Sequence, residues 1–473
     1  MKRKFLITAV GAAIFGLVPA APAMAQEAEA LSPEAVQAIL DNIWVFVAGI
    51  LVFLMQAGFG LVEAGLTRAK NVANIMAKNI ADMCIGALAF WAIGYGIAFG
   101  DGQWIGTDSF FLSGFGDGSF DGGYSGYTPF FFQVVFAAAA VTIASGAMAG
   151  RTKISGYLIF SAVMTAFIYP VVVHMFWQGD GILNRITVGD AAFSDFAGSS
   201  IVHSAGGWAA LMGAYFLGPR IGKYSNDGTP RAIPGHNIAF TVIGVFVLWF
   251  GWFGFNAGSE LAADSAVIRV GVTTMLAAAA GGFMAGAVMW MKVGFLDVAM
   301  TANGVLAGLV SITAGTGTMT PFGAVITGAI GGIIVVFSVL FFDRIHIDDP
   351  VGAISVHGVC GVWGTLAIGF FAKWDDAFLG REDAGLFYGG DVSQLVMQLV
   401  GVVIVAAWVL PTTGLLFFML KKMNMLRVSP EVEIAGLDVS EHGSAGYGIE
   451  TTFAGSLMSS RSPGIQDQSD RDS

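Results

Sequence analysis

Eleven long apolar runs constrain the fold of this chain more than any other feature of its 473 residues. A bilayer has a hydrocarbon core of about 30 Å, which takes roughly 20 residues of helix to cross. Runs of suitable length lie at residues 42–65, 72–99, 128–149, 153–177, 197–218, 237–256, 268–291, 295–315, 321–342, 351–371 and 393–420. The sequence therefore predicts a polytopic membrane protein.

Composition supports helices rather than a barrel. Only 12% of the residues are charged, whereas a soluble domain of average composition carries about 25%. The runs are continuous, whereas barrel strands show apolar residues at alternate positions over roughly ten residues. The 66 glycines fit this picture, because small residues let helix backbones approach closely in lipid. We expect an all-α fold of eleven transmembrane helices.

Charge and cysteine content exclude several classes of function. The formal net charge is −11, much of it in loops and the C-terminal tail, which argues against nucleic-acid binding. Cys84 and Cys360 lie inside apolar runs, so we expect packing thiols rather than a disulfide framework or a zinc site. The sequence predicts no cofactor, no bound metal and no enzymatic activity.

The two ends of the chain differ from the apolar middle. Lys2, Arg3 and Lys4 form a basic start, an apolar stretch follows, and Ala23-Met24-Ala25 resembles a cleavage site. This pattern is typical of a signal peptide over residues 1–25, with a first membrane helix as the alternative. We expect a periplasmic segment at 26–41, the transmembrane domain at 42–420, and a cytoplasmic tail at 421–473 that ends in disorder.

The distribution of basic residues indicates the orientation in the membrane. Cytoplasmic loops of membrane proteins carry an excess of Lys and Arg. If the chain starts outside the membrane, the predicted inner loops and inner helix ends carry Arg68, Lys70, Lys78, Arg151, Lys153, Arg220, Lys223, Arg231, Lys292, Arg344, Lys421, Lys422 and Arg427. The predicted outer loops and helix ends carry Arg185, Arg269, Lys373 and Arg381. We predict a bacterial inner-membrane protein with a periplasmic N-terminus and a cytoplasmic C-terminus.

A repeated motif relates the fifth and tenth runs. Residues 195–207 and 349–361 both read D-x-x-G-x-x-x-V-H-x-x-x-G. The copies are five runs apart, which is an odd number, so the two helices cross the membrane in opposite directions. The sequence predicts an inverted five-helix repeat plus one extra helix, an arrangement that places transporter substrates near the midplane.

Each copy of the motif carries one histidine. His203 and His357 follow Asp195 and Asp349 by eight residues, about 12 Å along a helix, which is near the midplane of the bilayer. One buried histidine is commonly a packing residue, but two in matched motifs favour a shared function. Facing imidazoles can share a proton and accept a hydrogen bond from a small donor.

The two aspartates stand at the starts of these helices. A carboxylate there caps free amide groups and suits the helix dipole. Capping alone is the favoured interpretation for Asp349. Asp195 faces the predicted outer side, where its charge can also stabilise a cation that is losing water. For Asp195, both interpretations stay open.

Aromatic residues and one serine are predicted to lie at the outer ends of three helices. They are Phe136 in the third run, Trp177 at the end of the fourth, and Trp252, Phe255 and Ser259 at the end of the sixth. Aromatic faces and a hydroxyl can hold a small cation by cation-π attraction and a hydrogen bond. An interfacial aromatic belt is the alternative.

Three strings in this chain are highly specific: D-F-A-G-x-x-x-V-H at 195–203, G-W-F-G-F-N-A-G-S at 251–259 and D-D-P-x-x-x-x-x-V-H-G-V-C-G at 348–361. Through these strings, residues 40 to 450 resemble the Amt/Mep/Rh ammonium transporter family. The first run looks more like the plant and cyanobacterial branch. Some bacterial members carry a second aspartate where Gly352 stands, so no role tied to that residue is carried over.

The resemblance implies roles for the residues above. Trp177, Phe255 and Ser259 would form an outer ammonium recruitment site, supported by Trp252. Phe136 and Phe255 would be stacked rings that close the pore, with His203 and His357 as the twin histidines inside it. Asp195 would match an acidic residue essential for conduction.

The resemblance also implies partners for the chain. It implies a homotrimer in membrane lipid, with one pore in each subunit. Residues 436–438 and 442–443 resemble a regulatory segment of the family, which suggests a PII-type cytoplasmic protein as a partner.

Three functions are compatible with these features. The leading hypothesis is a channel or transporter that binds ammonium or methylammonium outside, removes a proton, and passes ammonia, with the proton expected to follow through the histidines. A haem-binding redox protein could use His203 and His357 as axial ligands. An ammonium sensor that scarcely transports is the third, and the short tail disfavours it.

Overall fold

The computed structural model describes residues 31–116, 125–373 and 384–448. The predicted signal peptide at 1–25 and the predicted disordered end of the tail lie outside the described residues. Helices account for nearly all regular structure in the described chain, and one short β-hairpin joins β1 (Thr187–Val188) to β2 (Ala191–Ala192).

The predicted helical spans are present, several of them as joined helical segments. They are α1 (Pro33–Leu66), α2 (Val72–Ala89) with η2 (Phe90–Gly94) and α3 (Tyr95–Phe99), α4 (Tyr127–Ala147), α5 (Ile154–Val163) with η4 (Met164–Ile168) and α6 (Tyr169–Trp177), η6 (Ser199–Ser204) with α7 (Ala205–Leu217), α8 (Ile238–Trp252) with η7 (Phe253–Ala257), α9 (Ala266–Val293), α10 (Val298–Thr313), α11 (Pro321–Arg344), η8 (Ile354–Val359) with α12 (Cys360–Phe371), and α14 (Ser393–Lys422). Within the described chain, nine helices are long and apolar enough to cross a membrane. The shorter α10 and the η6–α7 segment complete the predicted eleven spans.

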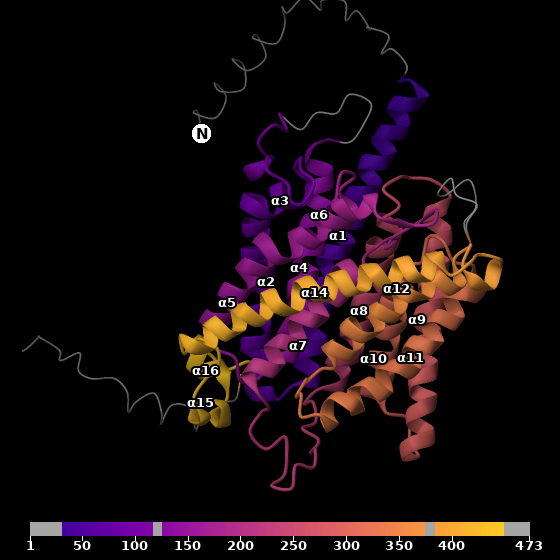
Figure 1. Cartoon of the computed structure of the whole chain (residues 1–473). Coiled ribbons are helices and arrows are strands. Elements are labelled where there is room, and N and C mark those ends of the chain that lie inside the picture. The colour runs from indigo at the N-terminus through magenta and orange to yellow at the C-terminus, as the bar shows by residue number, and fades with distance from the viewer. Residues whose placement is uncertain (1–30, 117–124, 374–383, 449–473) are drawn as a thin grey trace, which may run out of the picture.

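Short elements fill the connections and the tail. They are η1 (Ala69–Asn71), η3 (Phe110–Leu112), η5 (Ile182–Arg185), η9 (Leu386–Tyr388), α15 (Pro430–Ala435) and α16 (Leu437–His442). The tail helices pack beside the start of the second span, because α16 contacts both η1 and α2. We call this end of the bundle the tail face, and the opposite end, where α1 begins, the N-terminal face (Figure 1).

The first helix begins earlier than its apolar run. Ser32 accepts a hydrogen bond from the Ala35 amide, and Pro33 occupies the first helical position, where its missing N–H costs nothing. Part of the predicted periplasmic segment at 26–41 is therefore helix. Polar residues such as Gln37 and Asp41 hid this extension from a hydropathy argument.

The two repeats meet at glycines. A methyl group on Gly207 in α7 would lie 2.2 Å from the backbone nitrogen of Gly358 in η8, so only glycine permits this approach. The helix α14 lies outside both repeats, runs obliquely across the bundle in Figure 1, and packs against α7 and α12. This arrangement agrees with an inverted repeat plus one extra helix.

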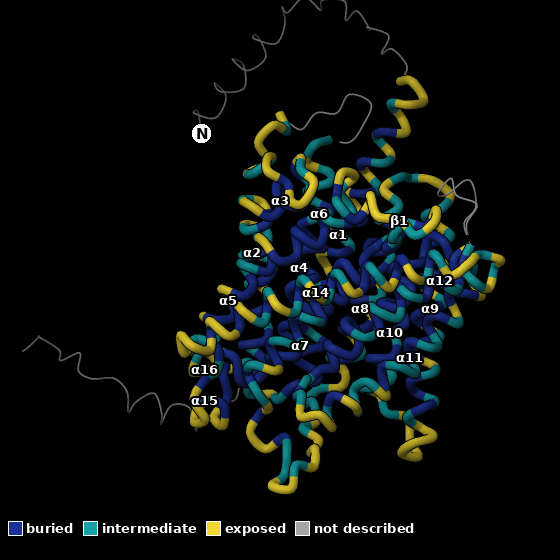
Figure 2. Tube along the Cα trace, viewed as in Figure 1, coloured by how far each residue is buried: buried dark blue, intermediate teal, exposed yellow. Residues whose placement is uncertain are grey.

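The flanks of the bundle are apolar. Ile268, Phe283 and Phe322 are each at least 70% exposed and lie on the outer helices α9 and α11. Figure 2 shows the buried residues concentrated inside the bundle. Exposed apolar side chains of this size on a helix flank fit contact with lipid. Cys360 is buried as predicted, but the packing role expected for Cys84 is wrong, because this thiol is exposed on α2.

Candidate functional site

The helix that carries His203 begins on a carboxylate cap. Asp195 Oδ1 accepts hydrogen bonds from the amides of Gly198 and Ser199, both at 2.8 Å. Its Oδ2 accepts from Ser200 at 2.8 Å and Ile201 at 3.0 Å. One side chain thus satisfies all four amides that begin this helix. Burial raises the pKa of Asp195 to about 6, and the four amides oppose that rise.

The helix that carries His357 begins in the same way. Asp349 Oδ1 accepts from the amides of Val351 at 3.2 Å and Gly352 at 3.0 Å, and Oδ2 accepts from Ile354 at 2.7 Å. The motif glycines Gly198 and Gly352 have φ angles of 106° and 82°, in the left-handed region that favours glycine. The predicted capping by both aspartates is confirmed.

Three candidate residues lie in π-helical turns. His203 is in η6, Phe255 is in η7 and His357 is in η8. Such turns are rare and frequently mark functional sites. The sequence predicted regular helices here. A π turn shifts the side chains that follow it around the helix, so it changes which of them face the interior.

The twin histidines contact each other directly. His203 Nδ1 and His357 Nδ1 are 3.2 Å apart, and the ring centroids are 5.2 Å apart with an interplanar angle of 27°. In a neutral pair one Nδ1 must donate and the other accept. The ring that donates at Nδ1 has a free acceptor at Nε2, and the other ring carries its proton at Nε2. The pair can therefore take a proton at one Nε2 and release one at the other.

This contact bears on the haem hypothesis. Axial ligands must approach an iron porphyrin from opposite faces of the macrocycle. Two nitrogens that share one hydrogen bond leave no space for a macrocycle between them. The geometry favours proton sharing over haem ligation.

A stack of rings leads from the histidines toward the N-terminal face. Phe255 lies 5.2 Å from His203 between ring centroids, and Phe136 stacks on Phe255 at 4.1 Å with an interplanar angle of 23°. Both phenylalanines are fully buried. Two parallel rings at this spacing exclude a solvated ion.

Trp252 lies beside His203, deeper in the bundle than the sequence predicted. Its ring stacks on His203 at 4.9 Å and 18°, and its Nε1 donates to Thr313 Oγ1 at 2.9 Å. The hydrogen bond fixes the indole, and the indole in turn fixes the plane of the His203 ring. Trp252 is thus placed to orient a histidine rather than to contact a cation at the mouth.

Trp177 and Ser259 lie at the end of the stack that is nearer the N-terminal face. Trp177 meets Phe136 edge to face at 6.2 Å, and its Nε1 donates to the backbone oxygen of Asp195 at 2.9 Å. Ser259 Oγ donates to the Phe255 carbonyl at 2.8 Å. Because the serine hydrogen is used in this bond, the hydroxyl oxygen is free to accept one from another donor. Both side chains are half-buried.

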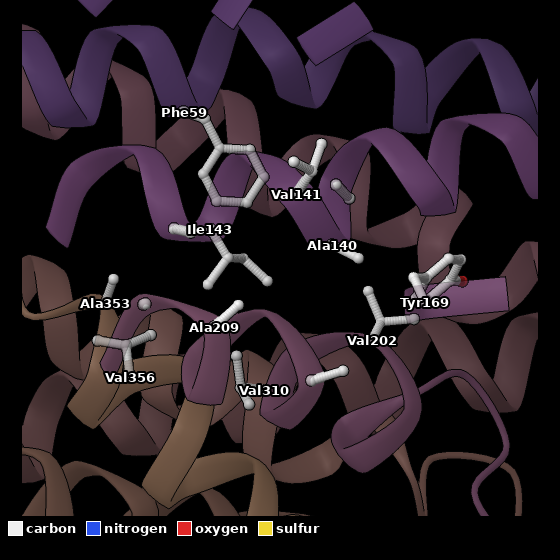
Figure 3. Close-up of a cluster of buried hydrophobic side chains, with 14 of the residues drawn as sticks. Phe59, Ala140, Val141, Ile143, Tyr169, Val202, Ala209, Val310, Ala353 and Val356 are labelled. Atoms are coloured by element: carbon white, nitrogen blue, oxygen red, sulfur yellow. The ribbon is translucent and has the colours of Figure 1, made fainter. Parts of the chain in front are cut away.

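The interior beyond the histidines, toward the tail face, is narrow and mostly apolar. Figure 3 shows Phe59, Ile143 and Val356 in a cluster of buried apolar side chains, and all three line this part of the interior. A cavity of ≈ 20 Å³ lies between these side chains and His357, which is room for about one water-sized molecule. Glu63 and Asn303 are polar residues that also line it.

Sequence reasoning missed a buried charged cluster beside this cavity. Glu63, Lys78 and Asp82 are each at most 3% exposed. Lys78 was expected at an inner helix end with the other orienting basic residues, and the structure buries it instead. The available signal was the presence of three ionisable residues inside predicted spans, which is costly in lipid.

A buried ion pair holds the start of η8 at the tail face. Arg220 donates to both carboxylate oxygens of Asp348 at 2.8 Å, and Arg151 donates to the Asp348 carbonyl at 2.7 Å. Burial alone would raise the pKa of Asp348, but Arg220 and Arg151 hold it well below its usual value. The helix that carries His357 is therefore anchored beside the tail.

The tail helices bind the same face. Glu433 accepts from the Ile221 amide at 2.7 Å and pairs with Arg427 at 2.8 Å. Asp438 accepts from the Asn74 amide at 3.0 Å, next to the start of α2. The tail thus connects the loop after α7 to the first turn of α2, both at the tail face.

Comparisons with known proteins agree with these features. The family model described as Ammonium Transporter Family matches residues 43–447. The chain is 46% identical to ammonium transporter Amt2 of Archaeoglobus fulgidus over 86% of this chain and 88% of that one. It is 38% identical to a putative ammonium transporter of Synechocystis sp., over 88% and 90%.

A solved structure has the same fold. A sensor Amt protein superposes with a TM-score of 0.80 at 38% identity, covering 86% of this chain and 100% of that one. The family match spans the aspartate caps, the ring stack and both histidines. The chain is therefore a member of the ammonium transporter family.

Proposed function

We propose that this protein takes up ammonium and methylammonium across a bacterial inner membrane. The observation that carries the proposal is the unbroken series of contacts from Trp177 through the stacked phenylalanines to the hydrogen-bonded histidines. Each part suits one step in moving a small protonated amine. The N-terminal face is periplasmic in this proposal, and the tail face is cytoplasmic.

The first step is recruitment of the cation. The Trp177 ring offers a π face, and the Ser259 oxygen offers a hydrogen-bond acceptor. Asp195 adds a negative charge behind Trp177, since the indole bonds to the Asp195 backbone. These groups replace part of the water that the cation loses.

The second step is loss of a proton. The stack of Phe136 on Phe255 must open for the substrate to reach the histidines. Ammonium then gives a proton to the free Nε2 of the pair: an N–H bond of the cation breaks, an N–H bond to the imidazole forms, and ammonia remains. Neutral ammonia crosses the apolar interior at much lower cost than a charged ion, and the proton follows through the histidine pair.

An ammonium sensor is the second candidate, because the chain resembles a protein described as a sensor Amt protein over that whole chain. The two functions differ in flux. A transporter moves labelled methylammonium into liposomes at a rate that rises with concentration and saturates. A sensor binds the cation with negligible flux.

The outer site gives a testable expectation. Trp177→Leu and Ser259→Ala should each raise the half-saturating ammonium concentration about two- to thirtyfold, because each removes one interaction of about 0.5–2 kcal/mol with the cation. Concentration dependence of uptake in liposomes measures this. Trp104→Leu, an exposed tryptophan in the loop after α3, is the matched control and should behave as the parent. Parent-like half-saturation in both site variants would favour an aromatic belt.

The tail is proposed to regulate transport and not to conduct. Asp438→Asn should weaken the contact with Asn74 and change the maximal uptake rate while leaving the half-saturating concentration unaltered. Removal of residues 459–473 should leave both values unchanged. A shift in half-saturation on either change would place the tail in the conduction path. A homotrimer and a PII-type partner that binds the tail face belong to this proposal.

A further inference from the structure

The most unusual feature outside the histidine site is a charged cluster inside the bundle. Glu63 comes from α1, and Lys78 and Asp82 come from α2. All three are buried, so water does not stabilise their charges. Ionisable groups at such depth normally pair with each other and mark ion or proton paths.

Glu63 uses one carboxylate oxygen and leaves the other available. Ser145 Oγ donates to Glu63 Oε2 at 2.6 Å, and Asn79 Nδ2 donates to the same oxygen at 3.5 Å. Across the described chain, no hydrogen bond reaches Oε1. Glu63 also lines the ≈ 20 Å³ cavity that His357 lines. A free acceptor therefore borders the cavity that begins at a pore histidine.

The other two charges lie behind Glu63. Lys78 Nζ donates to the Ser145 carbonyl at 2.7 Å, so Ser145 links Lys78 to Glu63. Asp82 Oδ2 accepts from the Tyr157 hydroxyl at 2.6 Å and from Thr142 Oγ1 at 3.2 Å. Asp82 does not line the cavity.

Charge balance favours uptake of one proton by this cluster when both carboxyl groups are ionised. One ammonium group and two ionised carboxylates carry a net charge of −1, which is costly in a dry interior. The cluster is neutral with one proton on a carboxyl group. Glu63 is the carboxyl that borders the cavity, so in its ionised form it is the one that can take up this proton from the pore.

We propose that Glu63 accepts the proton that leaves the twin histidines. This inference rests on the proposed function. The Nε2–H bond of the His357 imidazolium breaks, an O–H bond forms at Glu63, and the ring returns to neutral imidazole. One water in the cavity carries the proton where the two groups do not touch. No oxidant or further reactant takes part.

Glu63→Gln tests the proposal in proteoliposomes. The amide keeps an oxygen that accepts from Ser145, but it cannot take up a proton. The maximal ammonium-evoked current should fall at least tenfold, while the half-saturating concentration, which the outer site sets, should stay within twofold of the parent. Glu63→Asp keeps a carboxyl group and should recover part of the current.

Two further variants separate proton transfer from structural support. Glu63→Gln/Lys78→Met removes both charges together. If Glu63 served only to balance Lys78, this variant would recover the parent current; on our proposal the current stays low. It also carries the test if Glu63→Gln alone does not fold. Thr413→Val removes a buried, non-titrating hydroxyl that bonds within α14 and does not line the cavity, and it should retain the current.

The outcomes are distinct. Parent-like current in Glu63→Gln, or recovery in the double variant, would overturn the role of Glu63 and leave the proposed function intact. A parent protein with no ammonium-evoked current would overturn the proposed function and this inference with it.

Discussion

Replacing either pore histidine by aspartate should turn the protein into a potassium-permeable channel. A carboxylate at position 203 or 357 would be buried between rings, where desolvation disfavours its charge unless a cation neutralises it. A dehydrated potassium ion is such a cation. The parent should exclude potassium because this ion has no proton to release. We expect potassium flux in His203→Asp and His357→Asp to rise at least tenfold above the parent.

A histidine outside the ring stack serves as the control for the potassium permeability of these variants. His174 is also fully buried, but it contacts the backbone oxygens of Ala98 and Gly102 near the N-terminal face and takes no part in the ring stack. His174→Gln should keep potassium out. Folded His203→Asp and His357→Asp proteins that still carry ammonium and still refuse potassium would reduce the twin histidines to packing residues.

Loss of the Asp195 carboxylate should have the second large effect. Its four amide hydrogen bonds stabilise the start of η6, and each unsatisfied buried amide costs about 1–3 kcal/mol. The carboxylate also offsets the positive end of the helix dipole, which otherwise points toward Trp177 and the arriving cation. We expect Asp195→Asn to lower maximal ammonium uptake at least tenfold.

The inverted repeat supplies the matched control for this prediction. Asp349 caps η8 with three amide hydrogen bonds, at the tail face and away from the outer site. Asp349→Asn should lower the melting temperature to a similar extent as Asp195→Asn but retain more of the uptake. Equal loss of uptake and of thermal stability in the two variants would mean that Asp195 acts only as a cap.

Sequence reasoning could predict the spans and the paired motif because both follow from periodic physical constraints. The lengths of the apolar runs indicate where the transmembrane helices lie. The spacing from Asp195 to His203 and from Asp349 to His357 determines how deep the imidazole rings lie in the membrane. The inverted directions of their helices place the two histidines at a similar depth, and the structure shows that they are in direct contact. These features depend on few tertiary details.

Other features depend on packing that hydropathy does not encode. A π turn adds one residue to a helical turn, and nothing in the apolar pattern of residues 253–257 marks it. The depth of Trp252 follows from that packing and from its bond to Thr313. Lys78 lies six residues into a predicted run, and for that reason it was expected at a helix end. Its side chain instead donates to the carbonyl oxygen of a residue in α4 that is 67 positions away, and nothing in the sequence indicates this contact.

In the proposed mechanism, ammonium loses a proton at the twin histidines and crosses as ammonia, and the proton follows. The most direct measurement is the current evoked in proteoliposomes of the unaltered protein by equal gradients of ammonium and of potassium. We expect a saturating inward current with ammonium, no current with potassium, and loss of the ammonium current when both histidines are replaced by alanine. An equal current for both ions, or an unchanged ammonium current in the double alanine variant, would exclude this mechanism.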